Sequence, residues 1–318
     1  MGCKKLQKRR GRIWILLLIS LMFLSGFIFP EERKTKNLGY SIKLTFGKRN
    51  VPIGDVNSAL ESFNSNDLFE WSRVYTPDQI SGEIKTLNND CLDWEVELRK
   101  HISPNLSLSF ATSLVPVFIK NESSLTYIYR GSVGDQTSAF TFKPKIAWIP
   151  LKFGLCYSLI RFSGIELILS AGIGYHITKV SRSKELHETY PLGGSEWVIW
   201  HWKAHNAGGF SFHTGISLEL SITKKFIIVA EVQTRQAKMK NLKGKKWAES
   251  EFFGISGEYK GTLYYFNTWD IGIGFRYDDL TVWEEIPFAR IGGIYNERKA
   301  VLDLNGYSVR AGIRIKLF

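Results

Sequence analysis

Alternation of apolar and polar residues is the feature of this sequence that most restricts its fold. Beyond residue 36, eight segments alternate with a period of two, several of them over nine or more residues. Each such segment has one apolar and one polar face, which predicts β-strands rather than helices. The segments lie at about residues 40–46, 92–99, 106–114, 149–159, 166–178, 210–222, 226–235 and 307–317. We therefore expect one all-β domain over residues 37–318.

Two architectures alternate in this way, a soluble sandwich and a membrane-spanning barrel. Several segments exceed the usual strand of about five or six residues and match the roughly 9–11 residues that cross a bilayer. Tight turns also alternate with long polar or aromatic gaps, which lie at residues 48–90, 119–140, 181–206 and 238–305. Short turns at one rim and long loops at the other are typical of outer-membrane barrels. The sequence thus favours a closed, antiparallel, up-and-down transmembrane β-barrel whose four gaps are extracellular loops.

The N-terminus supports export of the chain. Its first twelve residues hold six Lys or Arg and no acid, and an apolar run follows at residues 13–29. This layout predicts a secretory signal peptide over residues 1–30, with an uncleaved anchor as the alternative. The same six bases supply half of the net charge of +12, and later charges are interleaved in sign. No nucleic-acid partner is therefore expected.

The number of strands depends on residues 238–305. A ninth alternating stretch begins near residue 262, but a tenth would have to come from residues 284–296, which do not alternate and contain Pro287. We expect eight strands, with 262–284 forming a hairpin above the membrane, and keep ten as the alternative. The first gap has helical spacing instead, with Asp55 as the expected N-cap. Its apolar residues are Val56, Ala59, Leu60 and Phe63, and a second short helical piece is indicated by Ile80, Ile84 and Leu87.

The polar faces of the strands point into the barrel, and they carry both signs of charge. An eight-stranded barrel has an interior just wide enough for side chains to fill, and charges confined there are costly unless paired. Six bases balance six acids, which predicts a lumen plugged by ion pairs; a path for protons or small solutes is the alternative. The candidate network is Lys43, Asp93, Glu95, Glu97, Arg99, Lys152, Glu166, Glu219, Glu231, Arg235, Arg310 and Arg314.

Catalytic and metal-binding arrangements find little support. His201 and His205 lie four residues apart without a third ligand nearby, and the surrounding Trp197, Trp200 and Trp202 fit a headgroup interface better. A Ser/His/acid set could be assembled from His176, His213, Ser170, Ser211 and inward acids, as any polar lumen allows. The three cysteines are too few and scattered for a disulfide scaffold or a zinc site. We expect no enzyme activity, metal or cofactor.

The closing segment DLNGYSVRAGIRIKLF resembles the last strand of Gram-negative outer-membrane β-barrel proteins, which commonly end in Phe. The segment GGFSFHTGISLELSITKKFIIVAEVQTRQAKMKNLKG resembles a hairpin of small, largely uncharacterised eight-stranded members of that family. The resemblance implies insertion by the barrel-assembly machinery, with Phe318 as the recognised element. Phe318 shares the parity of Lys316, however, whereas the family pattern places the last aromatic residue on the apolar face.

These observations predict an integral outer-membrane barrel with a structural or surface-interaction role. A small-solute pore is one alternative, and an outer-membrane lipid or peptide hydrolase is another. The expected partners are outer-membrane lipids and the assembly machinery, the extracellular ligand is not specified by the sequence, and we expect a monomer.

Overall fold

The computed structural model describes residues 39–63, 78–251, 254–255, 257–270, 275–284 and 294–317. The expected signal peptide and Phe318 lie outside these residues, so both remain predictions. Within the described residues, no helix is long and apolar enough to span a membrane.

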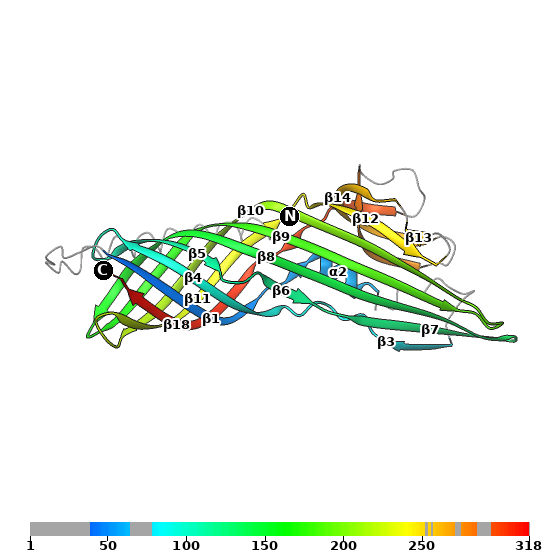
Figure 1. Cartoon of the computed structure of the whole chain (residues 1–318), viewed down its shortest axis with the longest axis horizontal. Helices are drawn as coiled ribbons and strands as arrows, with labels where there is room; N and C mark the ends of the chain where they lie inside the picture. Colours follow the sequence, from blue (N-terminus) through cyan, green and yellow to red (C-terminus); the bar gives the residue numbers. More distant parts are fainter. Residues whose placement is uncertain are drawn as a thin grey trace, which may run out of the picture.

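Eight antiparallel strands close into a ring (Figure 1). β1 pairs with β18 from Ser41↔Lys316 to Arg49↔Ser308, and this pairing closes the barrel. The other contacts run in order around the ring, which confirms eight strands rather than ten. The ring consists of β1 (Tyr40–Asn50), β4 (Asp90–His101), β5 (Leu106–Ser113), β8 (Gly134–Phe162), β9 (Ile165–Thr189), β10 (Ser195–Ser221), β11 (Phe226–Met239) and β18 (Gly306–Lys316).

Apolar side chains cover the outside of the half of the barrel that carries the tight turns. We call this half the lower barrel and its apolar outer surface the apolar belt. On β8, for example, Phe153 and Leu155 are 50% and 48% exposed, whereas the preceding residue, Lys152, is 3% exposed. The outward residues of the other ring strands are exposed in the same way. The oily side of the ribbons therefore contacts no second protein layer in the described structure, as expected of a barrel surrounded by lipid.

The three longest strands continue far beyond this apolar belt. β8, β9 and β10 have 29, 25 and 27 residues, and their upper halves contain much of what the sequence indicated as loops (Figure 1). The alternation persists there with opposite polarity: Ile146 and Trp148 point inward and are buried, whereas Lys145 points outward and is exposed. This inversion fits a wall that leaves the bilayer, because its outer face now meets water and its inner face surrounds an apolar core.

The upper barrel has a core of its own, which forms around α2 (Asp55–Glu61). We call α2 and the short strands above the apolar belt the cap. Val56, Ala59 and Leu60 of this helix belong to one buried cluster with inward residues of β8, β9, β10 and β11. The remaining cap elements are β2 (Ile53–Gly54), β3 (Gln79–Gly82), β6 (Val117–Lys120), β7 (Ser123–Gly131), β12 (Lys243–Ser250), β13 (Gly254–Ile255), β14 (Tyr259–Asp270), β15 (Phe275–Trp283), β16 (Ile294–Lys299) and β17 (Leu302–Asp303).

Two local predictions for the first gap are wrong. The helix forms, but Gly54 is its N-cap, because the Asp55 carboxylate instead accepts hydrogen bonds from Arg298 and the Val301 amide. The expected second helical piece is not helical: residues 79–82 form β3, which pairs with β7. Three apolar residues at helical spacing are weak evidence, and the available partner strand decides the outcome.

The described residues between 238 and 305 supply no strand to the ring, apart from the upper end of β11. β14 and β15 form the expected hairpin, from Thr262↔Trp283 to Asp270↔Phe275. The considered tenth strand is partly present as β16, but it pairs with β14 above the barrel and not with a ring strand.

Candidate functional site

Arg310 on β18 is the centre of a buried charge network in the lower barrel. Its side chain is 0% exposed, and its guanidinium donates to Asp93 at 3.1 Å and also contacts Glu95 and Glu231. The carboxylates come from β4 and β11, on the two sides of the β1–β18 pair. Gly47 lies opposite Arg310 in the ladder, and a Cβ there would lie 2.8 Å from the Arg310 Cγ. The glycine thus makes room for the β18 backbone and for the stem of the Arg310 side chain.

The network continues towards the end of the barrel that carries the tight turns. Lys43 Nζ lies 2.8 Å from Glu97 and 2.5 Å from Glu231, so it links β1 to both of these acids. Arg99 lies 2.8 Å from Glu97 and 3.4 Å from Glu219. Arg314 also contacts Glu219, at 2.7 Å. Each charge is therefore paired across strands.

Lys152 and Arg49 extend the network around the wall and upward. Lys152 Nζ contacts Glu95 and donates to Gln233 Oε1 at 2.6 Å. Arg49 contacts Asp93. The complete network has six bases and five acids: Lys43, Arg49, Arg99, Lys152, Arg310, Arg314, Asp93, Glu95, Glu97, Glu219 and Glu231.

Two of the twelve residues indicated by the sequence lie apart from these ion pairs. Glu166 pairs with Arg161 at 2.5 Å beside the β8–β9 turn. Arg235 is buried, but its Nε donates to the Leu304 carbonyl at 2.8 Å, and no ion pair of Arg235 is present among the described residues. Sequence reasoning missed Arg49. Its parity on β1 is the inward one, and the signal was lost because the predicted strand ended at residue 46.

Chemically, the network consists of buried charged groups that pair with one another, although Arg49 Nη1, Asp93 Oδ1, Arg310 Nε and Arg314 Nε have no hydrogen-bond partner in the described structure. All eleven residues are buried, including Arg310 at 2%, Arg314 at 1% and Glu95 at 1% exposure. Ionised groups taken out of water are tolerated when they are paired and hydrogen-bonded. The ion pairs offset most of the charge in the interior, where six bases face five acids.

The apolar cap forms a second layer above this network. Asp55 fastens α2 in place through Arg298, with nitrogen–oxygen distances of 2.5 and 2.7 Å. The paired Asp55 carboxylate raises the pKa of Arg298. α2 packs against inward residues of β8 to β11, so an apolar core lies above the charge network.

The Ser/His arrangement is incomplete. His176 Nε2 lies 2.8 Å from Ser211 Oγ, but no hydrogen-bond partner for His176 Nδ1 is present among the described residues. The pair therefore has no carboxylate to orient the imidazole, as a hydrolytic triad requires. The described part of the chain also shows no group of three or more His, Cys, Asp or Glu that could hold a metal ion.

The tryptophan-rich segment lies in the upper part of β10, outside the apolar belt. His201 stacks on Trp247, with ring centroids 4.9 Å apart. Trp202 is 3% exposed within the cap core, whereas Trp200 is 40% exposed. The headgroup location expected for these tryptophans therefore fails for Trp202, because its side chain points into the cap.

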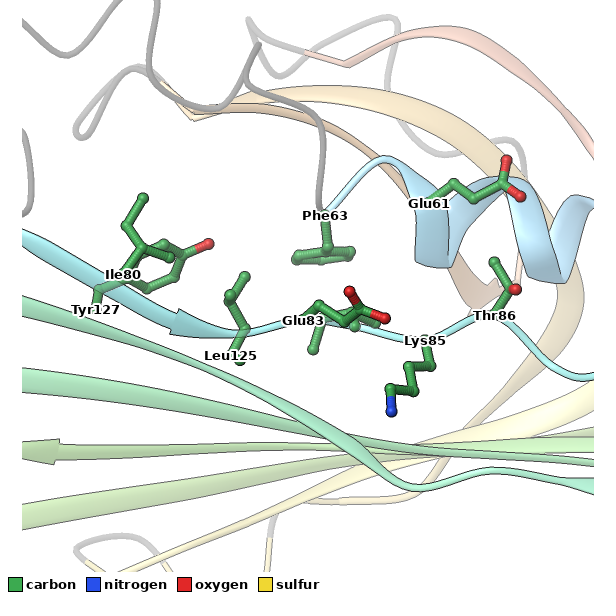
Figure 2. A pocket seen from close by; sticks show the side chains of 10 residues that line it. Glu61, Phe63, Ile80, Glu83, Lys85, Thr86, Leu125 and Tyr127 are labelled. Carbon is green, nitrogen blue, oxygen red and sulfur yellow. The ribbon is translucent and has the colours of Figure 1, made fainter.

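A pocket of about 640 Å³ lies at the surface of the cap. Figure 2 shows Glu61 and Phe63 on one side and Ile80, Glu83 and Leu125 on the other. Tyr127 lines the same pocket, and burial raises the pKa of its phenol. The lining mixes apolar side chains with the charged Glu61, Glu83 and Lys85.

Lys184 on β9 points into the cap among aromatic rings. Its Nζ lies 4.8 Å from the Phe63 ring centroid, 5.4 Å from that of Phe140 and 5.5 Å from that of Trp200. Burial lowers the pKa of Lys184 to about 8, although Asp279 acts in the opposite direction. The ammonium group is thus held in a poorly hydrated site.

No family model matches the sequence, and no curated protein matches it. The structure resembles that of the outer membrane protein OprG from Pseudomonas aeruginosa, at 9% identity and a TM-score of 0.42, covering 89% of this chain and 97% of OprG. It also resembles the outer membrane protease OmpT from Escherichia coli, at 7% identity and a TM-score of 0.27, covering 91% and 99%. A third similar structure is the translocator domain of the autotransporter NalP from Neisseria meningitidis, at 10% identity and a TM-score of 0.20, covering 98% of each chain. All three solved structures are outer-membrane β-barrel proteins.

Proposed function

We propose that this chain is a non-conducting barrel of the Gram-negative outer membrane that presents its long upper strands and cap at the cell surface. Its role is structural or one of surface interaction, not catalysis or transport. The observation that carries the proposal is the buried network around Arg310, which fills the lower lumen with paired side chains. The apolar belt supports location in a membrane, and the signal-like N-terminus supports export.

The extended upper barrel supports a role at the surface. β8, β9 and β10 continue well past the belt, and the cap gives them a protein-like core. A chain that needed only to fill the membrane would not require this structure. Lipids and the barrel-assembly machinery are the partners that we propose for the belt and for the C-terminal strand, and we propose a monomer.

Single-channel recording in planar bilayers tests the proposal against a pore. The purified full chain should give a folded barrel, which heat-modifiable migration on a denaturing gel would show, and no reproducible conductance steps. Steps that change when Arg235 is replaced by Ala would overturn the plugged-lumen proposal, because Arg235 lies in the interior just below the cap.

Hydrolysis is tested separately. Lipid and peptide hydrolysis should both stay at background for the wild-type chain, because the His176–Ser211 pair lacks an acid. An activity that disappears in His176→Ala or His213→Ala would establish the hydrolase instead. Fractionation of cells tests the location: recovery of the chain from the periplasm would overturn it.

A further inference from the structure

Exposed lysines gather directly above the apolar belt, on the side of the barrel formed by β6, β8, β9, β10, β12 and β14. We call them the lysine stripe. Six of them are exposed and Lys245 is half-buried. The stripe consists of Lys120, Lys145, Lys179, Lys203, Lys243, Lys245 and Lys260.

Strand register places these lysines in two adjacent rows. Lys120 pairs with Lys145, and the same row continues through Ser181 to Lys203, Lys245 and Lys260. The row below it runs from Lys179 through His205 to Lys243. Paired residues share a face of the sheet, and strands lie about 4.8 Å apart, so the upper row spans roughly 25 Å.

The stripe begins where the belt ends. On β9, exposed Ile173 and Ile177 occupy the same outward face as Lys179. Tyr175 lies between these two isoleucines. Its ring contacts that of Phe210 on β10, with ring centroids 5.6 Å apart. From Ile165 to Ile177, β9 covers about 40 Å of strand, which at a tilt of about 40° corresponds to roughly 30 Å along the membrane normal. The lysines therefore lie at headgroup height, where aromatic side chains also gather.

The stripe carries unbalanced positive charge. The outward positions of the two rows hold no carboxylate, and in the described structure only Lys245 among the seven forms an ion pair, with Glu258 at 2.5 Å. Lys143, one row higher, is by contrast paired with Glu185 at 2.8 Å and Glu122 at 3.4 Å. The stripe also has aromatic support: Lys145 lies over the Phe118 ring and Lys203 over the Trp247 ring, at 5.3 and 5.0 Å.

We propose that the lysine stripe binds the phosphate groups of lipids in the surrounding outer leaflet. The inference rests on the proposed outer-membrane location and adds a specific ligand class to it. Lysine stems cover apolar surface while their ammonium groups reach the polar layer, and clustered bases at this height attract anionic headgroups. A position at the lipid boundary, rather than at the tip of the cap, selects a membrane lipid over a soluble anion.

Native mass spectrometry of the full chain in detergent tests this inference. The probes are diphosphorylated lipid A, which has two headgroup phosphates, and zwitterionic phosphatidylethanolamine. The test variant combines Lys179→Glu with Lys203→Glu. The matched control combines Lys224→Glu with Lys225→Glu, which changes the charge equally at the exposed β10–β11 turn on the opposite rim.

The wild-type chain and the control should retain lipid A in preference to phosphatidylethanolamine. The test variant should bind lipid A at least about 30-fold more weakly, since the loss of each lysine near an anionic surface costs roughly fivefold and each new carboxylate adds repulsion. If the test variant retains lipid A as well as the wild-type chain does, the proposal is overturned. An acidic protein would then be the remaining candidate ligand of the stripe. Equal loss in both variants would also overturn it, because the attraction would then follow net charge alone. Heat-modifiable migration and conductance of the same samples report separately on the barrel and its closed lumen.

Discussion

Arg310 shows how one buried side chain can pair with several carboxylates at once. Its guanidinium lies among three carboxylates, Asp93, Glu95 and Glu231, and none of the four side chains is more than 8% exposed. In so dry a site the Coulomb interaction is strong, but so is the cost of leaving a charge alone. The contribution of Arg310 is therefore best measured by the effect of removing it.

Replacing Arg310 by Met should destabilise the barrel by about 3–5 kcal/mol, because buried carboxylates lose a partner. Urea unfolding in detergent micelles measures the change in the free energy of unfolding. Lys48→Met is the control: it removes a base from the same β1–β18–β4 region, but the Lys48 side chain is 67% exposed in its pair with Asp90. The control should be close to neutral. Equal effects of the two substitutions would show that burial of the network adds nothing to stability.

Lys184 makes stability depend on pH. Burial lowers its folded-state pKa to about 8 from the usual 10.5, so the unfolded chain binds the proton more tightly between these values. Stability contributed at this site should therefore be low below about pH 8 and should rise as the pH increases to about 10.5. The aromatic rings favour the ammonium form, but burial is the larger effect.

The difference in melting temperature between wild type and Lys184→Met, followed from pH 7 to pH 10.5, measures this dependence. The melting temperature of the wild type should rise relative to that of the variant as the pH increases. Lys145→Met is the control, because it removes one lysine at an exposed site. A constant difference across the range would mean that the rings fully offset the loss of hydration.

At the scale of the element, β8 combines two environments in one strand. Its inward positions change from buried Ile146 and Trp148 to buried Lys152, while its outward positions change from exposed Lys145 to exposed Phe153 and Leu155. The period of two is unbroken across this change. The solvent outside the wall, and not the backbone, therefore decides which face is apolar.

The two halves of β8 should respond oppositely to the same new charge. Leu155→Arg places a guanidinium on the lipid-facing belt, where it should cost about 2–4 kcal/mol near the bilayer midplane. Ala147→Arg places it on the same face of the same strand, above the belt, and should be tolerated. The fraction of heat-modifiable protein in the membrane fraction measures both. Tolerance of Leu155→Arg would contradict lipid contact at this face.

The alternation in the sequence was sufficient to predict the ring strands and most of the charge network. Ten of the twelve indicated residues take part in the interstrand network, since parity alone places a residue inside or outside. The other two, Glu166 and Arg235, lie apart from these ion pairs. Parity could not show that Glu166 lies beside a turn, within reach of Arg161, or that the Leu304 carbonyl would bind Arg235.

The cap was much harder to predict. Its strands lie within the gaps between the alternating segments. In these strands the apolar and aromatic residues point inward and the polar residues point outward, which is the reverse of the arrangement in the apolar belt. Pairings such as Gln79↔Ile128 join residues that are distant in sequence, and local spacing carries no information about them. The helix over residues 55–61 was recognisable because its apolar spacing is local.

In the whole molecule, the charge network and the apolar core around α2 follow one another along the barrel. The charge network lies inside the apolar belt, and the cap core around α2 lies above it. A solute that passed one would still meet the other. The barrel should therefore conduct ions only when both the charge network and the cap core are opened. The conductance of the combined variant should exceed the sum of the conductances of the two separate variants.

Arg310→Ser with Glu231→Ser opens the network gently, because Lys43 keeps Glu97 and Lys152 keeps Glu95. Leu60→Asp opens the cap, since Leu60 is 1% exposed in α2 and a carboxylate there disfavours its docking. Neither change alone should produce conductance steps in a planar bilayer, whereas the combination should. Leu60→Asp with Lys143→Ser and Glu122→Ser is the matched control, because it removes a base and an acid paired at 3.4 Å on the outer surface. Conductance from the network variant alone would show that the cap leaves a path for ions, and the closed state would then depend on the buried ion pairs.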